Sequence, residues 1–142
     1  MNRAKPEWRL RLLQALCAGA LLAVAGCGGF KVVPVSGKAT LDGGPLTHGA
    51  VSFNPDPAKG NTARASCTGR LTGDGQYELY TDDGHRVVKG APPGWYKVTA
   101  LFPGEDKPPP LNKKYLDFAK TDLSVEVVEN PEPGRYDLKF TK

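Results

Sequence analysis

Residues 35–46 read VSGKATLDGGPL and contain the pattern that decides the fold. Val35, Ala39 and Leu41 occupy alternate positions, as expected of a strand with one buried face. The Asp42-Gly43 pair that follows is typical of a tight hairpin turn. These twelve residues therefore predict a strand, a turn and a chain that folds back.

The same two-residue period recurs along most of the chain. It marks seven short segments: Val33 to Leu41, Val51 with Phe53, Ala63 to Leu71, Tyr77 with Leu79, Tyr96 to Ala100, Leu123 to Val127, and Tyr136 to Phe140. Clusters rich in Gly, Pro, Asn and Asp separate them, which is turn chemistry. With no long helical period after residue 32, the pattern predicts an all-β, seven-stranded antiparallel sandwich.

Four motifs, taken in order, resemble the carboxypeptidase regulatory-like domain. They are residues 35–46, 49–53 (GAVSF), 71–79 (LTGDGQYEL) and 90–98 (GAPPGWYKV). The resemblance covers roughly Val33 to Phe140 and implies an immunoglobulin-like, transthyretin-like sandwich. Many small bacterial lipoproteins consist of this domain alone, and the fold implies no single activity.

One enzyme branch of the transthyretin-like group, the hydroxyisourate hydrolases, can be tested against this sequence. Those enzymes use histidines and an arginine and end in a Tyr-Arg-Gly-Ser type tail. This chain ends in KFTK, and both His48 and His85 fall in expected turns. The resemblance therefore does not extend to that activity.

The N-terminus has the build of a signal peptide, with a basic start, an apolar run from Leu12 to Ala25 and small residues before a cysteine. The apolar run is shorter than the ~20 residues that a membrane-spanning helix needs. Val24-Ala25-Gly26-Cys27 resembles the bacterial lipobox, which implies cleavage before Cys27 and palmitate or related acyl chains on that cysteine. The alternative is an ordinary secretory peptide that leaves Cys27 as a stray thiol.

This interpretation divides the chain into three parts. Residues 1–26 are a helical lipoprotein signal peptide, 27–32 the acylated cysteine with a short tether, and 33–142 the sandwich domain. Acyl chains on Cys27 would hold the domain at a membrane of the cell envelope. In related lipoproteins an Asp after the cysteine favours the inner membrane. Here Gly28 stands there, which favours the outer membrane, and the outer side of the inner membrane remains the alternative.

The basic charge of the chain lies largely in the targeting segment. The whole sequence has 19 Lys and Arg against 15 Asp and Glu. Without residues 1–26, which hold four basic residues and one acid, 15 basic and 14 acidic residues remain. A domain so close to neutrality lacks the basic stripe of a nucleic-acid-binding protein, so no nucleic acid partner is expected.

Cys67 has no partner once Cys17 is removed and Cys27 is acylated. It lies in one register with Ala63, Ala65 and Leu71, so the pattern predicts a buried, unreactive thiol. A nucleophilic or metal-binding cysteine is the alternative, but no suitably spaced His, Asp or second Cys accompanies it.

No motif for catalysis, a cofactor or a metal emerges. The sequence lacks a phosphate-binding G-x-x-x-x-G-K-[ST] loop, an H-E-x-x-H helix and paired cysteines. His48 and His85 are expected in exposed turns. Asp82 and Asp83 are too few for calcium, whose sites gather six to eight oxygens. We therefore expect a non-enzymatic protein with no catalytic residues, no metal site and no cofactor.

Phe102 to Thr121 is longer than a hairpin of this fold requires and contains Pro108-Pro109-Pro110, which favours polyproline II. Leu111, Tyr115 and Phe118 then fall on one face of a short helical segment. One interpretation is a plug that closes an end of the sandwich. The other is a recognition loop acting with an outward Trp95, with candidate binding residues Trp95, Lys113, Lys114 and Tyr115.

Two functional hypotheses follow from the sequence. The first is a membrane-anchored envelope lipoprotein that acts as a non-enzymatic binding or scaffolding module for an unknown envelope protein or glycan. The alternative is a carbohydrate-binding or enzyme-assisting accessory domain that acts through Trp95 and the long loop.

Overall fold

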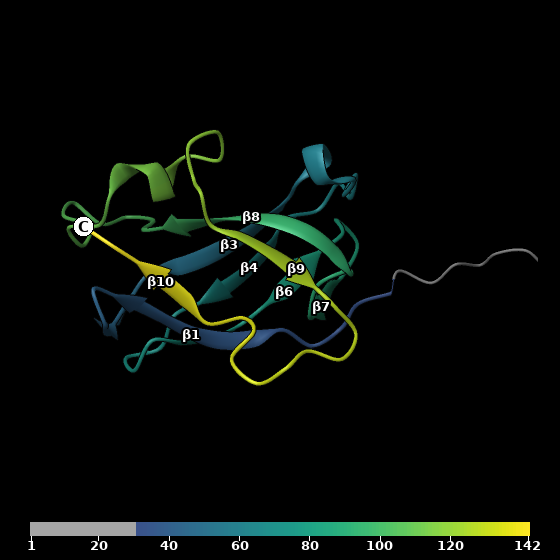
Figure 1. Ribbon diagram of the computed structural model, residues 1–142, viewed down its shortest axis with the longest axis horizontal. Coiled ribbons are helices and arrows are strands. Elements are labelled where there is room, and N and C mark those ends of the chain that lie inside the picture. The colour runs from purple at the N-terminus through teal and green to yellow at the C-terminus, as the bar shows by residue number, and fades with distance from the viewer. Residues whose placement is uncertain (1–30) are drawn as a thin grey trace, which may run out of the picture. The chain divides into compact units, whose positions relative to one another are not determined.

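Two β-sheets face each other across an apolar core in the computed structural model, which describes residues 31–142 (Figure 1). The smaller sheet contains β1 (Ser36–Leu41), β2 (Gly44–Pro45), β5 (Gln76–Glu78) and β10 (Leu138–Phe140). The larger sheet contains β3 (Ala50–Pro55), β4 (Cys67–Arg70), β6 (Tyr80–Asp82), β7 (Val87–Lys89), β8 (Gly94–Leu101) and β9 (Ser124–Val127), in the order β7-β6-β4-β3-β8-β9. The coarse prediction of an all-β sandwich is confirmed.

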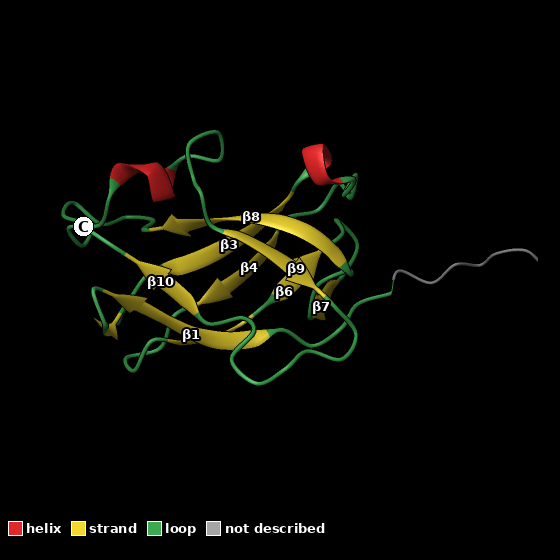
Figure 2. Cartoon of the chain, in the orientation of Figure 1, coloured by secondary structure: helices red, strands yellow, loops and turns green. Residues whose placement is uncertain are grey.

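Helical structure in residues 31–142 is limited to two short 3-10 turns, η1 (Pro57–Lys59) and η2 (Lys113–Leu116), drawn red in Figure 2. In both turns the residue before the helix caps it. Asp56 accepts a hydrogen bond from the Ala58 amide, and Asn112 accepts one from the Lys114 amide. The predicted signal-peptide helix and Cys27 lie outside the described residues.

The strand count and one pairing direction correct the sequence prediction. The described residues contain ten strands rather than seven, because β2, β6 and β7 were not predicted. Those three strands have only two or three residues each, too few for an alternating pattern to show. The sandwich is also not purely antiparallel, since β1 and β10, from opposite ends of the domain, pair in parallel.

The core between the sheets consists mostly of residues that the alternation placed inward. Phe53 lies between Tyr77 and Tyr96, with ring centroids 6.1 and 6.0 Å away. Leu79, Val98 and other inward residues are fully buried around them. In the described residues no buried side-chain nitrogen or oxygen lacks a hydrogen-bond partner. The core is therefore well formed by the criteria of native proteins.

The predicted plug is partly confirmed. Leu111 and Tyr115 are buried, and the Tyr115 ring meets the Phe140 ring edge to face at 5.1 Å. Phe118 was predicted to share this inward face, and that is wrong, because it is 42% exposed. The i, i+4, i+7 spacing assumed a continuous α-helix, whereas η2 is one 3-10 turn that ends at Leu116.

Cys67 is fully buried at the start of β4, as predicted. Its Sγ lies 3.1 Å from Thr81 Oγ1, and burial raises the pKa of the thiol. The predicted strand began too early, however, because Ala63 and Ala65 precede β4 and are only half-buried.

We expect Cys67 to be unreactive in the native protein, because the thiolate is the reactive form and burial disfavours it. Native and denatured protein would be treated with a thiol reagent and the Cys67 peptide analysed by mass spectrometry. Labelling should occur only after denaturation. Rapid labelling of the native protein would show that the thiol is accessible.

Candidate functional site

A groove of about 810 Å³ lies where the chain crosses from the smaller sheet to the larger one. β1 and β5 contribute outward side chains from the smaller sheet, and β4 and β6 contribute them from the larger. The lining residues are Ser36, Gly37, Lys38, Thr68, Arg70, Thr72, Gln76, Tyr77, Glu78, Tyr80 and Asp137. Concave surfaces with converging polar groups are the default place to seek a ligand site.

Two glycines let the strands around this groove approach closely. A Cβ at Gly69 on β4 would lie 2.7 Å from the carbonyl oxygen of Glu78, and one at Gly37 on β1 would lie 2.3 Å from that of Tyr136. Neither distance is possible for a real side chain. The hydroxyl of Tyr77 donates to the same Tyr136 carbonyl, and burial raises the pKa of this phenol. The floor of the groove is therefore fixed by backbone packing.

The groove carries charges of both signs, and within residues 31–142 its two carboxylates are engaged in contacts while its two basic side chains are not. Lys89 at the rim bonds Glu78 at 2.8 Å, which lowers the pKa of the Glu78 carboxyl and raises that of the Lys89 ammonium. Asp137 accepts a hydrogen bond from the Lys38 amide. Lys38 Nζ and the Arg70 guanidinium have no carboxylate within 4 Å among the described residues. The site is polar without a strong excess of either sign.

Tyr80 provides an exposed aromatic ring beside these polar groups. It lies on β6, pairs across the sheet with Thr68 and Lys89, and is 43% exposed. Its hydroxyl reaches the Glu78 carboxylate at 3.5 Å. An aromatic ring with one apolar face and a polar tip is the kind of side chain that contacts ligands with mixed surfaces.

A second depression of about 270 Å³ lies beside the groove. Ser36 lines both, and the rest of the second depression comes from Pro34 and residues 131–136. The two hollows adjoin at Ser36, the first residue of β1, and are otherwise lined by different residues.

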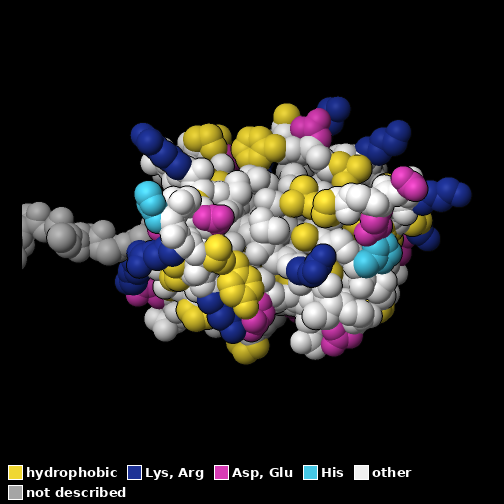
Figure 3. Space-filling model, turned by 180° about the vertical axis from the view of Figure 1, so that it is seen from behind, with side chains coloured by type: hydrophobic (Ala, Val, Ile, Leu, Met, Phe, Trp, Pro, Cys, Tyr) yellow, Lys and Arg dark blue, Asp and Glu magenta, His cyan; other side chains and the backbone are white. Residues whose placement is uncertain are grey.

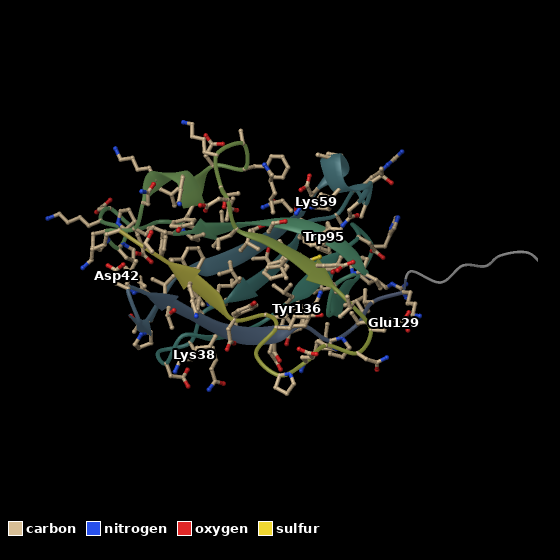
Figure 4. The ribbon with its side chains drawn as sticks, in the orientation of Figure 1. Lys38, Asp42, Lys59, Trp95, Glu129 and Tyr136 are labelled. Carbon is tan, nitrogen blue, oxygen red and sulfur yellow. The ribbon has the colours of Figure 1, made fainter. Side chains whose placement is uncertain are left out.

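The structure places Trp95 on a different part of the molecule. Trp95 is the second residue of β8 and has its side chain on the outer face, as predicted, but it is half-buried. The Lys59 ammonium lies over the indole ring, 3.9 Å from its centroid, and donates to Ser124 Oγ at 2.8 Å. Figure 4 shows Trp95 and Lys59 together, well apart from Lys38 in the groove.

The other sequence-predicted residues do not join Trp95 into one site. Lys113 and Lys114 belong to η2, which lies near the C-terminus of the chain (Figure 1). Lys113 is exposed, and Lys114 pairs with Asp122 at 2.7 Å, which raises the pKa of Lys114. Tyr115 is 3% exposed and packs in the core, so its ring is not presented to a partner. A binding role for Tyr115 stays an untested prediction.

Sequence reasoning missed the groove because its residues come from distant segments. The sequence did predict part of the groove lining as exposed. The outward positions of the predicted strands include Thr68, Arg70, Gln76 and Glu78. The sequence pattern does not indicate that these residues of the two sheets line one groove. Tyr80 lies on β6, a strand that the alternation did not reveal.

The expected turns around the histidines and acidic pairs are present. His48 is exposed and pairs with Glu105, with Nε2 and Oε2 3.1 Å apart. Asp82 and Asp83 accept hydrogen bonds from the backbone amides of the β6–β7 turn. Within residues 31–142 no three His, Cys, Asp or Glu side chains gather as a metal site would require.

Positive and negative side chains are interspersed on the face shown in Figure 3, without a large area of one sign. In the part of the chain that the structure describes, no helix has the length and apolar character to cross a membrane.

Comparison with protein-family models, curated proteins and solved structures gave no match for this chain.

Proposed function

We propose that this protein is a lipid-anchored, non-enzymatic binding module of the bacterial cell envelope. The sequence Val24-Ala25-Gly26-Cys27 supports the anchor, and the resemblance to the carboxypeptidase regulatory-like domain supports a small transthyretin-like module that works by binding. The all-β sandwich of residues 31–142 agrees with that resemblance at the level of fold class. The anchor would lie at the outer side of the inner membrane or at the outer membrane.

The short tether limits how far the domain can stand from the membrane. Val33 is the first residue held by the sandwich, through two backbone hydrogen bonds with Ala91 of 2.9 and 3.0 Å. Six residue steps separate Cys27 from Val33, and a fully extended chain covers at most ~3.6 Å per residue. A lipid on Cys27 would therefore keep Val33 within about 20 Å of the bilayer surface.

The observation that carries the binding role is the groove beside β1. It gathers hydroxyl, amide, carboxylate, guanidinium and ammonium groups around one exposed ring on a rigid two-sheet scaffold. The Asp137 and Glu78 carboxylates and the Gln76 amide are engaged in pairwise contacts, and none of these contacts is a nucleophile–base pair that would point to a reaction. Such a surface suits recognition of a ligand.

Cell fractionation tests the anchor directly. Wild-type protein and Cys27→Ser would be expressed in a bacterial host and separated into membrane and soluble fractions. The wild type should pellet almost entirely with membranes, because several acyl chains bind far more firmly than one. The variant should lose most of this association. Equal pelleting of both proteins would show that Cys27 does not provide the anchor.

A further inference from the structure

We propose that the groove binds an extended, largely neutral saccharide, with Tyr80 as the platform on which a sugar ring stacks. This inference rests on the proposed binding function and names the class of ligand. It moves the carbohydrate hypothesis from Trp95, whose ring is covered on one side by Lys59, to Tyr80, which is 43% exposed beside the groove.

The charges in the groove favour a neutral ligand over a strongly charged one. Lys38 and Arg70 bring two positive groups to the lining, and Glu78 and Asp137 bring two negative groups. Beside the lining, Lys89 pairs with Glu78 and Asp74 accepts from Gln76, which adds one charge of each sign. The two carboxylates would repel a polyanion, and the ammonium and the guanidinium would repel a polycation. A ligand without net charge encounters neither repulsion.

The polar groups match the chemistry of sugar hydroxyls. A hydroxyl both donates and accepts hydrogen bonds, so a site for several of them needs both kinds of partner. Arg70 only donates, Glu78 only accepts while ionised, and Gln76 does both. Thr68 adds a hydroxyl that serves in either role, whereas the Thr72 hydroxyl already donates to Asp74 and is left to accept.

The strands that line the groove leave little room for a peptide to add as another strand. β4 already pairs with β3 and β6, and β1 pairs with β10 on one side and with β5 and β2 on the other. The Lys38 amide is taken by the Asp137 carboxylate. Peptide recognition by strand addition requires an unpaired edge. Among the described strands that line the groove, only β5, which pairs with β1 alone, keeps an unpaired side of three residues, so recognition in this groove rests mainly on side chains.

The second depression next to the groove favours a chain of sugars over a single one. Both hollows share Ser36, and the second extends past Pro34 toward Arg135. A sugar unit that reaches past Ser36 would find further contacts in the second depression. We therefore expect affinity to rise with the length of the oligosaccharide until both hollows are filled.

The test uses full-length protein purified in detergent and an array of neutral and acidic oligosaccharides of graded length. The variants are Tyr80→Ala, Tyr80→Phe and Trp95→Ala, each first shown by circular dichroism to unfold like the wild type. We expect the wild type to bind a neutral series. Tyr80→Ala should weaken that binding about ten-fold or more, because the stacking ring is lost. Tyr80→Phe, which keeps the ring, and Trp95→Ala should stay close to the wild type.

Three results would overturn the inference: no binding to any neutral oligosaccharide, binding confined to acidic ones, or binding that depends on Trp95 and not on Tyr80. Fractionation of the same proteins keeps this test separate from the anchor. A protein that pellets with membranes and binds no saccharide refutes the ligand class alone. A protein that binds saccharide but stays soluble refutes the anchor alone.

Discussion

Replacing Tyr115 by Ala should lower the free energy of unfolding by about 3 kcal/mol or more, the usual cost of truncating a buried aromatic side chain. Tyr115 is 3% exposed and meets the Phe140 ring edge to face. Its hydroxyl also lies 3.2 Å from Thr141 Oγ1. The change would leave a cavity at the point where η2 closes the sandwich. Urea unfolding followed by circular dichroism measures the loss.

The neighbouring lysine supplies the matched control. Lys113 precedes Tyr115 in the same 3-10 turn and is exposed, so Lys113→Ala should change stability by less than ~0.5 kcal/mol. If Tyr115→Ala unfolds at the same urea concentration as Lys113→Ala, Tyr115 does not hold the loop to the core.

Gly37→Ala should lower the free energy of unfolding about as much as Tyr115→Ala does, although it adds only one methyl group. An ideal Cβ at Gly37 would lie 2.3 Å from the carbonyl oxygen of Tyr136 and 2.7 Å from its carbonyl carbon. Both atoms are backbone, so no flexible side chain can move aside. We expect β1 to shift away from the segment before β10, with a loss of about 3 kcal/mol, at the upper end for overpacking. The Tyr77 hydroxyl would then lose its bond to the same carbonyl.

Gly73→Ala is the control for this change, because no atom lies within 4 Å of its added Cβ. It should leave the urea midpoint near that of the wild type, or raise it slightly by restricting the unfolded chain. Equal urea midpoints for Gly37→Ala and Gly73→Ala would show that the sheet accommodates a Cβ at residue 37 beside the Tyr136 carbonyl, against this prediction.

The alternation of apolar residues predicted most of the core because it reports directly on burial. Val35, Phe53, Cys67, Tyr96 and Leu138 are all buried, as their registers required. Strand direction is not contained in that period, so the parallel pairing of β1 with β10 could not be derived. Very short strands such as β7 give too few positions for a period to appear.

The site was less predictable than the core. The alternation predicted Trp95 as an outward aromatic residue, and it does lie on the outer face. Lys59, from η1, nevertheless covers one side of its ring. Tyr80 carried no comparable signal, since its strand was not recognised. The groove depends on how strands of the two sheets approach each other, and the alternation does not show a close approach such as that of Gly69 to the Glu78 carbonyl.

The mass of the mature N-terminal peptide tests the lipid anchor most directly. Protein isolated from bacterial membranes would be digested and its N-terminal peptide analysed by mass spectrometry. We predict a peptide that begins at Cys27 and carries the mass of attached acyl chains, because residues 1–26 have been removed and Cys27 modified. An unmodified Cys27, or a chain that still begins at Met1, would contradict the assignment of this protein as a lipid-anchored module.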